Sequence, residues 1–97
     1  MPTYISLVNL TDQGVRDAKN IRRRIDETYK LFESFGVRFR DLYLVTGSYD
    51  YIAVVEAPDD ETAAKAVLSL GSRGNVRTQT FRAFTSDETE GIVNDLR

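Results

Sequence analysis

The sequence predicts a single α+β domain, residues 1–97, in which four antiparallel strands carry two helices on one face. Strand-like and helix-like apolar patterns alternate along the chain in the order β-α-β-β-α-β. Glycine or proline lies at several of the boundaries between these segments. Right-handed crossovers in the two β-α-β units then place both helices on the same face. The expected fold is a ferredoxin-like sandwich with strand order 4-1-3-2.

The first half of the chain supplies a strand, a helix and a second strand. Residues 3–10 are rich in β-formers, with apolar side chains on both faces. Residues 11–36 begin with helix-capping residues and continue with apolar residues at steps of three and four, which predicts one long amphipathic helix. Residues 37–46 are expected to form the second strand. Gly47-Ser48 then predicts a two-residue hairpin turn.

The second half repeats the strand-helix-strand pattern. Residues 49–57 carry the strongest strand signal, and the acidic residues 59–61 then cap a second helix that ends at Gly71. Residues 75–84 alternate in the manner of a fourth strand. The pattern Thr85-x-x-Glu88 resembles a capping box, which predicts a short terminal helix.

The composition excludes several kinds of chemistry. The chain has no histidine and no cysteine, so the usual zinc, haem and iron–sulfur ligands and the Ser-His-Asp and Cys-His nucleophile pairs are missing. We therefore expect no metal and no cofactor. The formal charge of -2 gives no general attraction to nucleic acid or to anionic membranes, and no apolar run approaches the ~20 residues of a membrane span. A cytoplasmic protein without nucleic-acid or membrane partners is expected.

The two central strands indicate self-association. In the order 4-1-3-2, the first and third strands lie in the middle of the sheet, and both are apolar on both faces. The helices cover only one of these faces. A chain of this length also buries only about two-thirds of the surface that its unfolded form exposes. The sequence therefore predicts a homodimer packed sheet to sheet, or a higher oligomer.

Polar residues from separate stretches are expected at one edge of this sheet. Antiparallel pairing places the end of the first strand beside the starts of the third and fourth strands. The candidate ligand-binding residues gathered there are Asn9, Thr11, Tyr49, Asp50, Arg77 and Thr78. One interpretation is a small pocket for an anionic or carbonyl group, held by Arg77 near a helix N-terminus. In the alternative interpretation these residues are structural: Asp50 and Arg77 form an ion pair, and the other polar residues bond to local backbone groups at the turns.

The residues that carry a family resemblance span residues 2–90. They are Thr3-Tyr4-Ile5-Ser6-Leu7, Gly47-Ser48-Tyr49-Asp50 with the following Val54 to Glu61, and Leu70 to Thr78. These stretches resemble the GYD-domain family, although Ser48 separates Gly47 from Tyr49 in the element that names the family. The resemblance implies a ferredoxin-like dimeric α+β barrel and a family without an established activity.

Three functions remain open on these grounds. The first is a small-molecule binding or sensing module, which uses the polar edge or the space between sheet and helices. The second is a cofactor-free enzyme, monooxygenase- or isomerase-like, with Asp50 as a base whose pKa Arg77 would lower. The third is nucleic-acid binding through Gly71-Ser72-Arg73-Gly74 and Arg22-Arg23-Arg24. A helix C-cap explains the glycine-containing motif better, and a solvated helix face explains the arginine run better. Of the three functions, binding of a small molecule is preferred, with the cofactor-free enzyme as the alternative.

Overall fold

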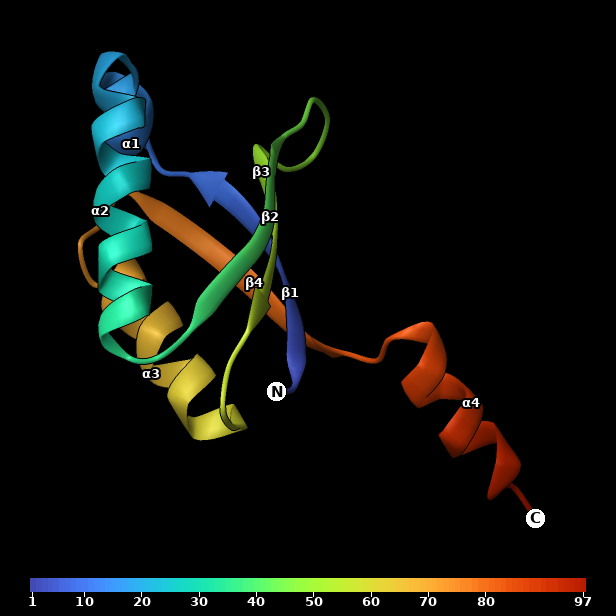
Figure 1. Cartoon of the computed structure of the whole chain (residues 1–97). Coiled ribbons are helices and arrows are strands. Elements are labelled where there is room, and N and C mark those ends of the chain that lie inside the picture. The colour runs from blue at the N-terminus through green and yellow to red at the C-terminus, as the bar shows by residue number, and fades with distance from the viewer.

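Four antiparallel strands form one sheet in the order β2-β3-β1-β4 in the computed structural model, which describes residues 1–97 (Figure 1). The strands are β1 (Thr3–Leu10), β2 (Arg38–Leu44), β3 (Tyr51–Glu56) and β4 (Val76–Ala83). The helices are α1 (Asp12–Arg16), a 3-10 turn (Ala18–Asn20), α2 (Ile21–Ser34), α3 (Asp60–Gly71) and α4 (Ser86–Asn94). The strand order is the predicted 4-1-3-2 read from the other edge, so the predicted fold class is confirmed.

The two faces of the sheet differ because α2 and α3 cover only one of them (Figure 1). Strand alternation directs Tyr4, Val8 and Val55 toward these helices, and all three are buried. Their neighbours Ile5 and Leu7 point to the opposite face and are only half-buried. The apolar character of the central strands on both sides therefore leaves an apolar sheet face without a helix.

The core lies between the sheet and the two long helices. Phe32 of α2 packs there with Val55 of β3. The buried face of α3 consists of Ala63 and Ala66, whose small side chains let this helix approach the sheet closely. Asp59 caps α3 by accepting a hydrogen bond from the Thr62 backbone N–H at 2.8 Å, as the acidic cap predicts.

The single helix expected over residues 11–36 is wrong, because the structure divides this segment into α1, a 3-10 turn and α2. The division lies at Asp17, whose carboxylate accepts a hydrogen bond from the Asn20 side chain at 2.6 Å and also pairs with Arg24. Side chains that bond locally in this way compete with regular helix. The first turn is held separately, because Gly14 packs directly against the Asn75 backbone.

The predicted two-residue hairpin turn is also wrong. The Val45 backbone N–H donates to the Asp50 carbonyl oxygen at 2.9 Å, so the four residues 46–49 separate the paired ends. Gly47 in this loop has a φ of 131°, a conformation that favours glycine. As a result β3 begins at Tyr51, two residues later than the sequence pattern indicated.

The terminal helix α4 forms as the capping box predicted. The Glu88 backbone N–H donates to the Thr85 hydroxyl at 3.2 Å, and the Thr85 backbone N–H donates to the Glu88 carboxylate at 2.9 Å. In Figure 1, α4 projects from the sheet on the side away from α2 and α3. No helix of the chain combines the length and the apolarity needed to cross a membrane.

Candidate functional site

A mostly apolar cavity of about 90 Å³ lies between α2 and the sheet. A single water molecule occupies about 10 to 15 Å³ on this scale, so the space is large enough for a small organic molecule. Strands β1 and β3 form its floor, α2 forms its roof, and residues of β2, α3 and β4 close its sides. Its lining includes Ser6, Arg24, Thr28, Tyr29, Ala53 and Thr78.

Small side chains in the middle of the sheet produce this cavity. Ser6 of β1 lies directly opposite Ala53 of β3 and, on its other side, opposite Thr80 of β4. Above this floor, α2 presents Ile25 and Tyr29, one helical turn apart. The long side chains of the helix do not fill the space above the small ones of the sheet. The cavity thus results from the residue sizes at one row of the sheet.

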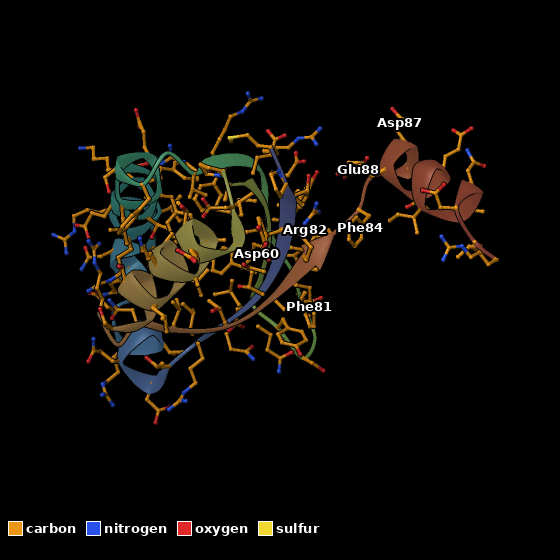
Figure 2. The ribbon with its side chains drawn as sticks, turned by 90° about the horizontal axis from the view of Figure 1, so that it is seen from below. Asp60, Phe81, Arg82, Phe84, Asp87 and Glu88 are labelled. Carbon is orange, nitrogen blue, oxygen red and sulfur yellow. The ribbon has the colours of Figure 1, made fainter.

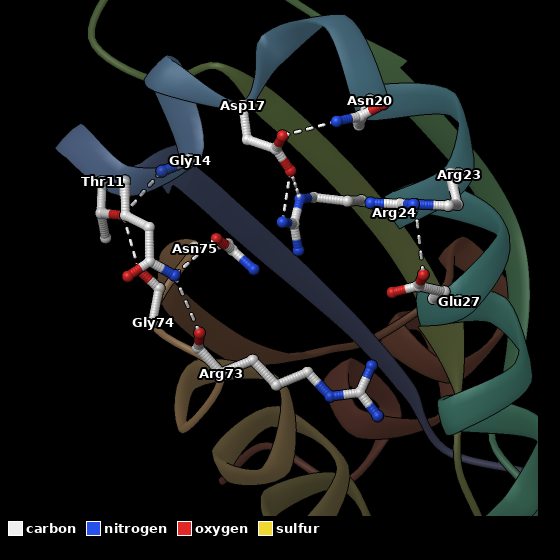
Figure 3. Close-up of polar contacts among 11 residues, drawn as sticks. Thr11, Gly14, Asp17, Asn20, Arg23, Arg24, Glu27, Arg73, Gly74 and Asn75 are labelled. Atoms are coloured by element: carbon white, nitrogen blue, oxygen red, sulfur yellow. Dashed lines mark hydrogen bonds and ion pairs between the residues drawn. The ribbon is translucent and has the colours of Figure 1, made fainter.

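The polar groups around the cavity are few, and most already have partners. The Ser6 hydroxyl shares a hydrogen bond of 2.8 Å with Thr80, and the Thr28 hydroxyl donates to the Arg24 carbonyl oxygen at 2.8 Å. The Arg24 guanidinium pairs with Asp17 (Figure 3). Hydrogen bonds from Asn20 and from Arg24 hold the pKa of Asp17 below its usual value. The cavity therefore offers mainly apolar contact.

The loop that follows α3 is fixed by α1 beside this cavity (Figure 3). Thr11 donates from its hydroxyl to the Gly74 carbonyl oxygen at 2.6 Å and from its backbone to the Asn75 carbonyl oxygen at 3.0 Å. The Gln13 amide donates to the Arg73 carbonyl oxygen at 3.2 Å and to the Asn75 side chain at 2.9 Å. The glycine-containing loop is thus used for packing within the chain.

The structure distributes the predicted site residues over two faces of the sheet. Thr78 faces the helices and lines the cavity. Asn9 and Arg77 are cross-strand partners on the opposite face, because alternation along β4 turns consecutive residues to opposite sides. The Tyr49 hydroxyl donates to the Gln79 side chain at 3.0 Å, and Gln79 lies two residues after Arg77, on the same face of β4.

Asp50 and Thr11, the other two predicted site residues, accept hydrogen bonds from backbone N–H groups. The Asp50 carboxylate accepts a hydrogen bond from the Leu10 backbone N–H at 2.8 Å, and the Thr11 hydroxyl accepts one from the Gly14 backbone N–H at 3.1 Å. The alternative Asp50–Arg77 pair is not among the five ion pairs of the chain. Arg22 of the arginine run pairs instead with Asp26 at 3.6 Å on an exposed helix face.

Sequence reasoning missed the central row of the cavity. Ser6 and Ala53 are small residues in the middle of two strands whose other helix-facing positions are large, such as Tyr4 and Val55. Only the register, which sets Ser6 opposite Ala53, shows that the two small side chains coincide. A search for small residues at matched positions of the central strands could have found them.

A separate polar cluster surrounds Tyr4 at the other end of the sheet, and its members Asp60 and Arg82 are labelled in Figure 2. The buried Tyr4 hydroxyl donates a hydrogen bond to the Asp60 carboxylate. The Arg82 guanidinium lies 5.8 Å from the centre of the Tyr4 ring. Burial, followed by the interaction with Asp60, raises the pKa of Tyr4 to about 12.

This pKa predicts a loss of stability in strong base. The native state holds the Tyr4 proton more tightly than the unfolded chain, so its contribution is complete below pH 10 and falls as the pH rises toward 12. We expect urea denaturation to show a decline of about 1.4 kcal/mol between pH 9 and pH 11 from this group. The Tyr4→Phe variant should lack that decline; an identical decline in both proteins would contradict the assignment.

Comparisons with known proteins agree with this architecture. The crystal structure of MtbAldR superposes with a TM-score of 0.67 at 20% identity, covering 88% of this chain and 52% of MtbAldR. This chain therefore spans about half the length of that protein. The crystal structure of TTHA0845 from Thermus thermophilus has a TM-score of 0.58 at 25% identity, covering 89% of this chain and 96% of the other.

The sequence comparisons identify the family. A curated protein of Thermus thermophilus, named glutamine synthetase and cystathionine beta-lyase binding protein, is 46% identical over 84 residues. The match covers 86% of this chain and 88% of that protein. The family model described as the GYD domain matches residues 4–93, which include all of the sheet except Thr3 and both helices that cover it. The chain belongs to the GYD domain family.

Proposed function

We propose that this protein is a binding module that holds a small, mostly apolar molecule in the cavity between α2 and the sheet. The cavity of about 90 Å³ is the observation that carries this proposal. Small-molecule sites in proteins are typically concave and mainly apolar, with a few polar groups that orient the ligand. The Thr78 hydroxyl is available to orient a polar group of such a molecule, and the Thr28 hydroxyl, which donates to the Arg24 carbonyl oxygen, can still accept a hydrogen bond.

A neutral ligand fits this cavity better than an ion. Arg24 is the charged residue among the lining residues, and Asp17 already neutralises it. An additional charge in the apolar interior would lose its hydration without gaining a new partner. The proposed ligand is therefore a neutral aromatic or short aliphatic compound with at most one or two hydrogen-bonding groups.

The proposed module is a homodimer that forms through the helix-free face of the sheet. Ile5, Leu7, Ile52 and Val54 make a continuous apolar patch there, and Phe81 extends it over β4 with 52% of its surface exposed. Large contiguous apolar patches are typical of interfaces. A second copy would cover this patch with the same residues, as two-fold symmetry requires.

We also propose a second ligand contact at the polar edge of this face. The Arg77 guanidinium takes part in none of the five ion pairs, and Asn9 lies directly opposite it in the sheet. Arginine binds carboxylate and phosphate groups through paired hydrogen bonds. The predicted site would thus bind an anionic group at the margin of the dimer, on the face opposite the apolar cavity.

The cavity proposal can be tested with a variant that fills the space. Ala53→Leu adds three carbons to the floor of the cavity, where Ala53 is 4% exposed. We expect indole, used as a neutral aromatic probe, to shift the amide resonances of cavity residues in the unmodified protein. The same titration with Ala53→Leu should show at least a tenfold weaker affinity, because the added side chain occupies the binding volume.

A matched control separates filling from a general effect of leucine. Ala64→Leu places the same side chain on the exposed surface of α3 and should leave the titration unchanged. Circular dichroism would establish that both variants are folded. Indole shifts that are confined to surface residues, or that persist in folded Ala53→Leu, would overturn the cavity proposal.

The second candidate function is binding of an enzyme. It is favoured by the name of the Thermus thermophilus relative, which is 46% identical over most of both chains. We expect this protein to co-elute with glutamine synthetase or cystathionine beta-lyase of its own source in size-exclusion chromatography. A mixture in which neither enzyme changes its elution volume would exclude this candidate at the concentration used.

A further inference from the structure

Helix α4 presents an apolar surface that its own domain leaves uncovered. Ile92 and Val93 are about half exposed, and Leu96 just beyond the helix is 72% exposed. Phe84, in the segment that leads into α4, is 53% exposed. Figures 1 and 2 both show α4 on the side of the sheet away from α2 and α3. These side chains therefore extend beyond the helix-free face.

Arg82 at the end of β4 holds α4 in this position (Figure 2). Its guanidinium lies 4.4 Å from the centre of the Phe84 ring and 3.6 Å from the Glu88 carboxylate. The same guanidinium donates a hydrogen bond to the Thr3 carbonyl oxygen at 3.3 Å. These contacts join the end of the sheet to Phe84 and Glu88 and so fix the direction of α4. Helix α4 is therefore an arm that extends from the domain in a defined direction.

A groove of suitable chemistry lies at the opposite edge of the sheet. It has a volume of about 730 Å³ and runs along β2 beside the end of α2. Tyr29 and Phe39 pack edge to face there, with ring centres 4.7 Å apart. Arg40 lies at the bulge of β2, is exposed and belongs to none of the five ion pairs. The groove thus combines aromatic surface with the unpaired Arg40, and Glu33 and Asp41 also line it.

The topology shows how α4 of one copy can reach the groove of another. The pairing registers place Thr3, Glu56, Arg38 and Ala83 in one row, so β4 ends at the same end of the sheet where β2 begins. If two sheets pack face to face about an axis parallel to the strands, the β4 edge of each copy faces the β2 edge of the other. Each α4 then arrives beside the partner's groove.

Charged residues lie on both surfaces. Residues 86–97 contain four carboxylates and one guanidinium: Asp87, Glu88, Glu90, Asp95 and Arg97. The groove has Arg38 and Arg40 at its edge, and Arg38 is paired only with Glu56, at 3.8 Å. Glu33 and Asp41 also line the groove, so the electrostatic match is local: it lies between the carboxylates of α4 and Arg40, which is in no ion pair. The apolar face of α4 matches the aromatic surface of the groove.

We propose that α4 is an exchanged arm, which docks in the groove formed by Tyr29, Phe39 and Arg40 of a second copy of this chain. This inference rests on the proposed dimer, and it adds to that dimer a contact at each margin of the paired sheets. Docking covers the apolar side chains of α4 and gives Arg40 acidic partners.

Cross-linking between two variants tests the exchange, because the chain has no cysteine of its own. Val93→Cys places a thiol on α4, and Glu33→Cys places one beside the groove. The two purified variants are mixed and treated with a short bifunctional maleimide. We expect a covalent product of two chains from the mixture, in at least fivefold greater yield than from Val93→Cys mixed with Lys65→Cys, which lies on the exposed surface of α3.

The possible failures are distinguishable. If sedimentation shows that the protein is a dimer but the Val93→Cys and Glu33→Cys mixture gives no excess product, the arm proposal is wrong and the dimer stands. If the doubly substituted chain cross-links only within itself, α4 folds back on its own domain and the exchange is excluded. A monomer in sedimentation would remove the proposed dimer together with the arm.

Charge reversal provides an independent readout. Arg40→Glu should lower the cross-linking yield at least fivefold at low salt, because the acidic arm then meets an acidic groove. Arg16→Glu at the end of α1 makes the same change of charge away from the groove and should have no such effect. Equal yields from both variants would show that the groove does not receive α4.

Discussion

Replacing Gly14 with alanine is expected to lower the free energy of unfolding by about 3 kcal/mol or more. A Cβ atom at this position would lie 2.2 Å from the Asn75 carbonyl oxygen, far inside van der Waals contact. That oxygen accepts the hydrogen bond from the Thr11 backbone N–H at 3.0 Å. The substitution must therefore separate α1 from the loop after α3. Urea denaturation monitored by circular dichroism measures the change.

Gly91 in α4 provides the matched control. It is also a helical glycine, but an added Cβ would meet no atom within 4 Å. Gly91→Ala should make the free energy of forming α4 more favourable by about 1 kcal/mol, which is the difference in helix propensity between the two residues. A Gly14→Ala protein as stable as the unmodified chain would mean that α1 and the loop do not pack as described.

Replacing Leu7 with lysine is expected to weaken the proposed dimer by at least about a thousandfold. Leu7 lies at the centre of the helix-free face, opposite Ile52 on β3. Each copy loses roughly 2 kcal/mol of apolar burial and must bury part of a charged side chain, and two-fold symmetry doubles the effect. A loss of about 4 kcal/mol corresponds to a factor of about a thousand in the dissociation constant.

Sedimentation equilibrium at micromolar concentration measures this effect. Leu68→Lys is the control, because Leu68 on α3 is already 72% exposed and its replacement should leave the association unchanged. If Leu7→Lys sediments as the same oligomer as the unmodified protein, the helix-free face is not the interface.

The fold could be predicted because local sequence patterns identify its strands and helices, and general rules of connection restrict how these elements are arranged. The alternation in β1 and β3, the Asp59 cap and the Thr85–Glu88 capping box all appear in the structure as the sequence indicates. Crossover handedness then leaves few ways to arrange six elements. Each of these features depends on residues that are close together in the chain or on a general rule of connection.

The departures arise where distant residues decide a local conformation. The break between α1 and α2 combines the local contacts of Asp17 with the packing of Gly14 against Asn75, which is far away in the sequence. The hairpin loop is longer than expected because Asp50 bonds to the backbone of β1 at Val8 and Leu10. Helical periodicity and turn propensity contain no information on such contacts.

The candidate site was predicted less well, for a geometric reason. Topology correctly places Asn9 and Arg77 side by side at the end of the sheet. However, alternation sends Thr78 to the other face, where it lines the apolar cavity. The cavity itself depends on Ser6 and Ala53 lying opposite each other, which requires the strand register. Strand identity can be read from composition, whereas register needs the paired structure.

The proposed role of the space between α2 and the sheet is to hold a small neutral molecule. A crystal structure of the protein grown with millimolar indole tests this role most directly. We expect density for the indole ring between Tyr29 of α2 and Ala53 of β3, in the cavity of about 90 Å³. A structure in which neighbouring side chains fill that space and indole is absent from it would contradict the proposed role.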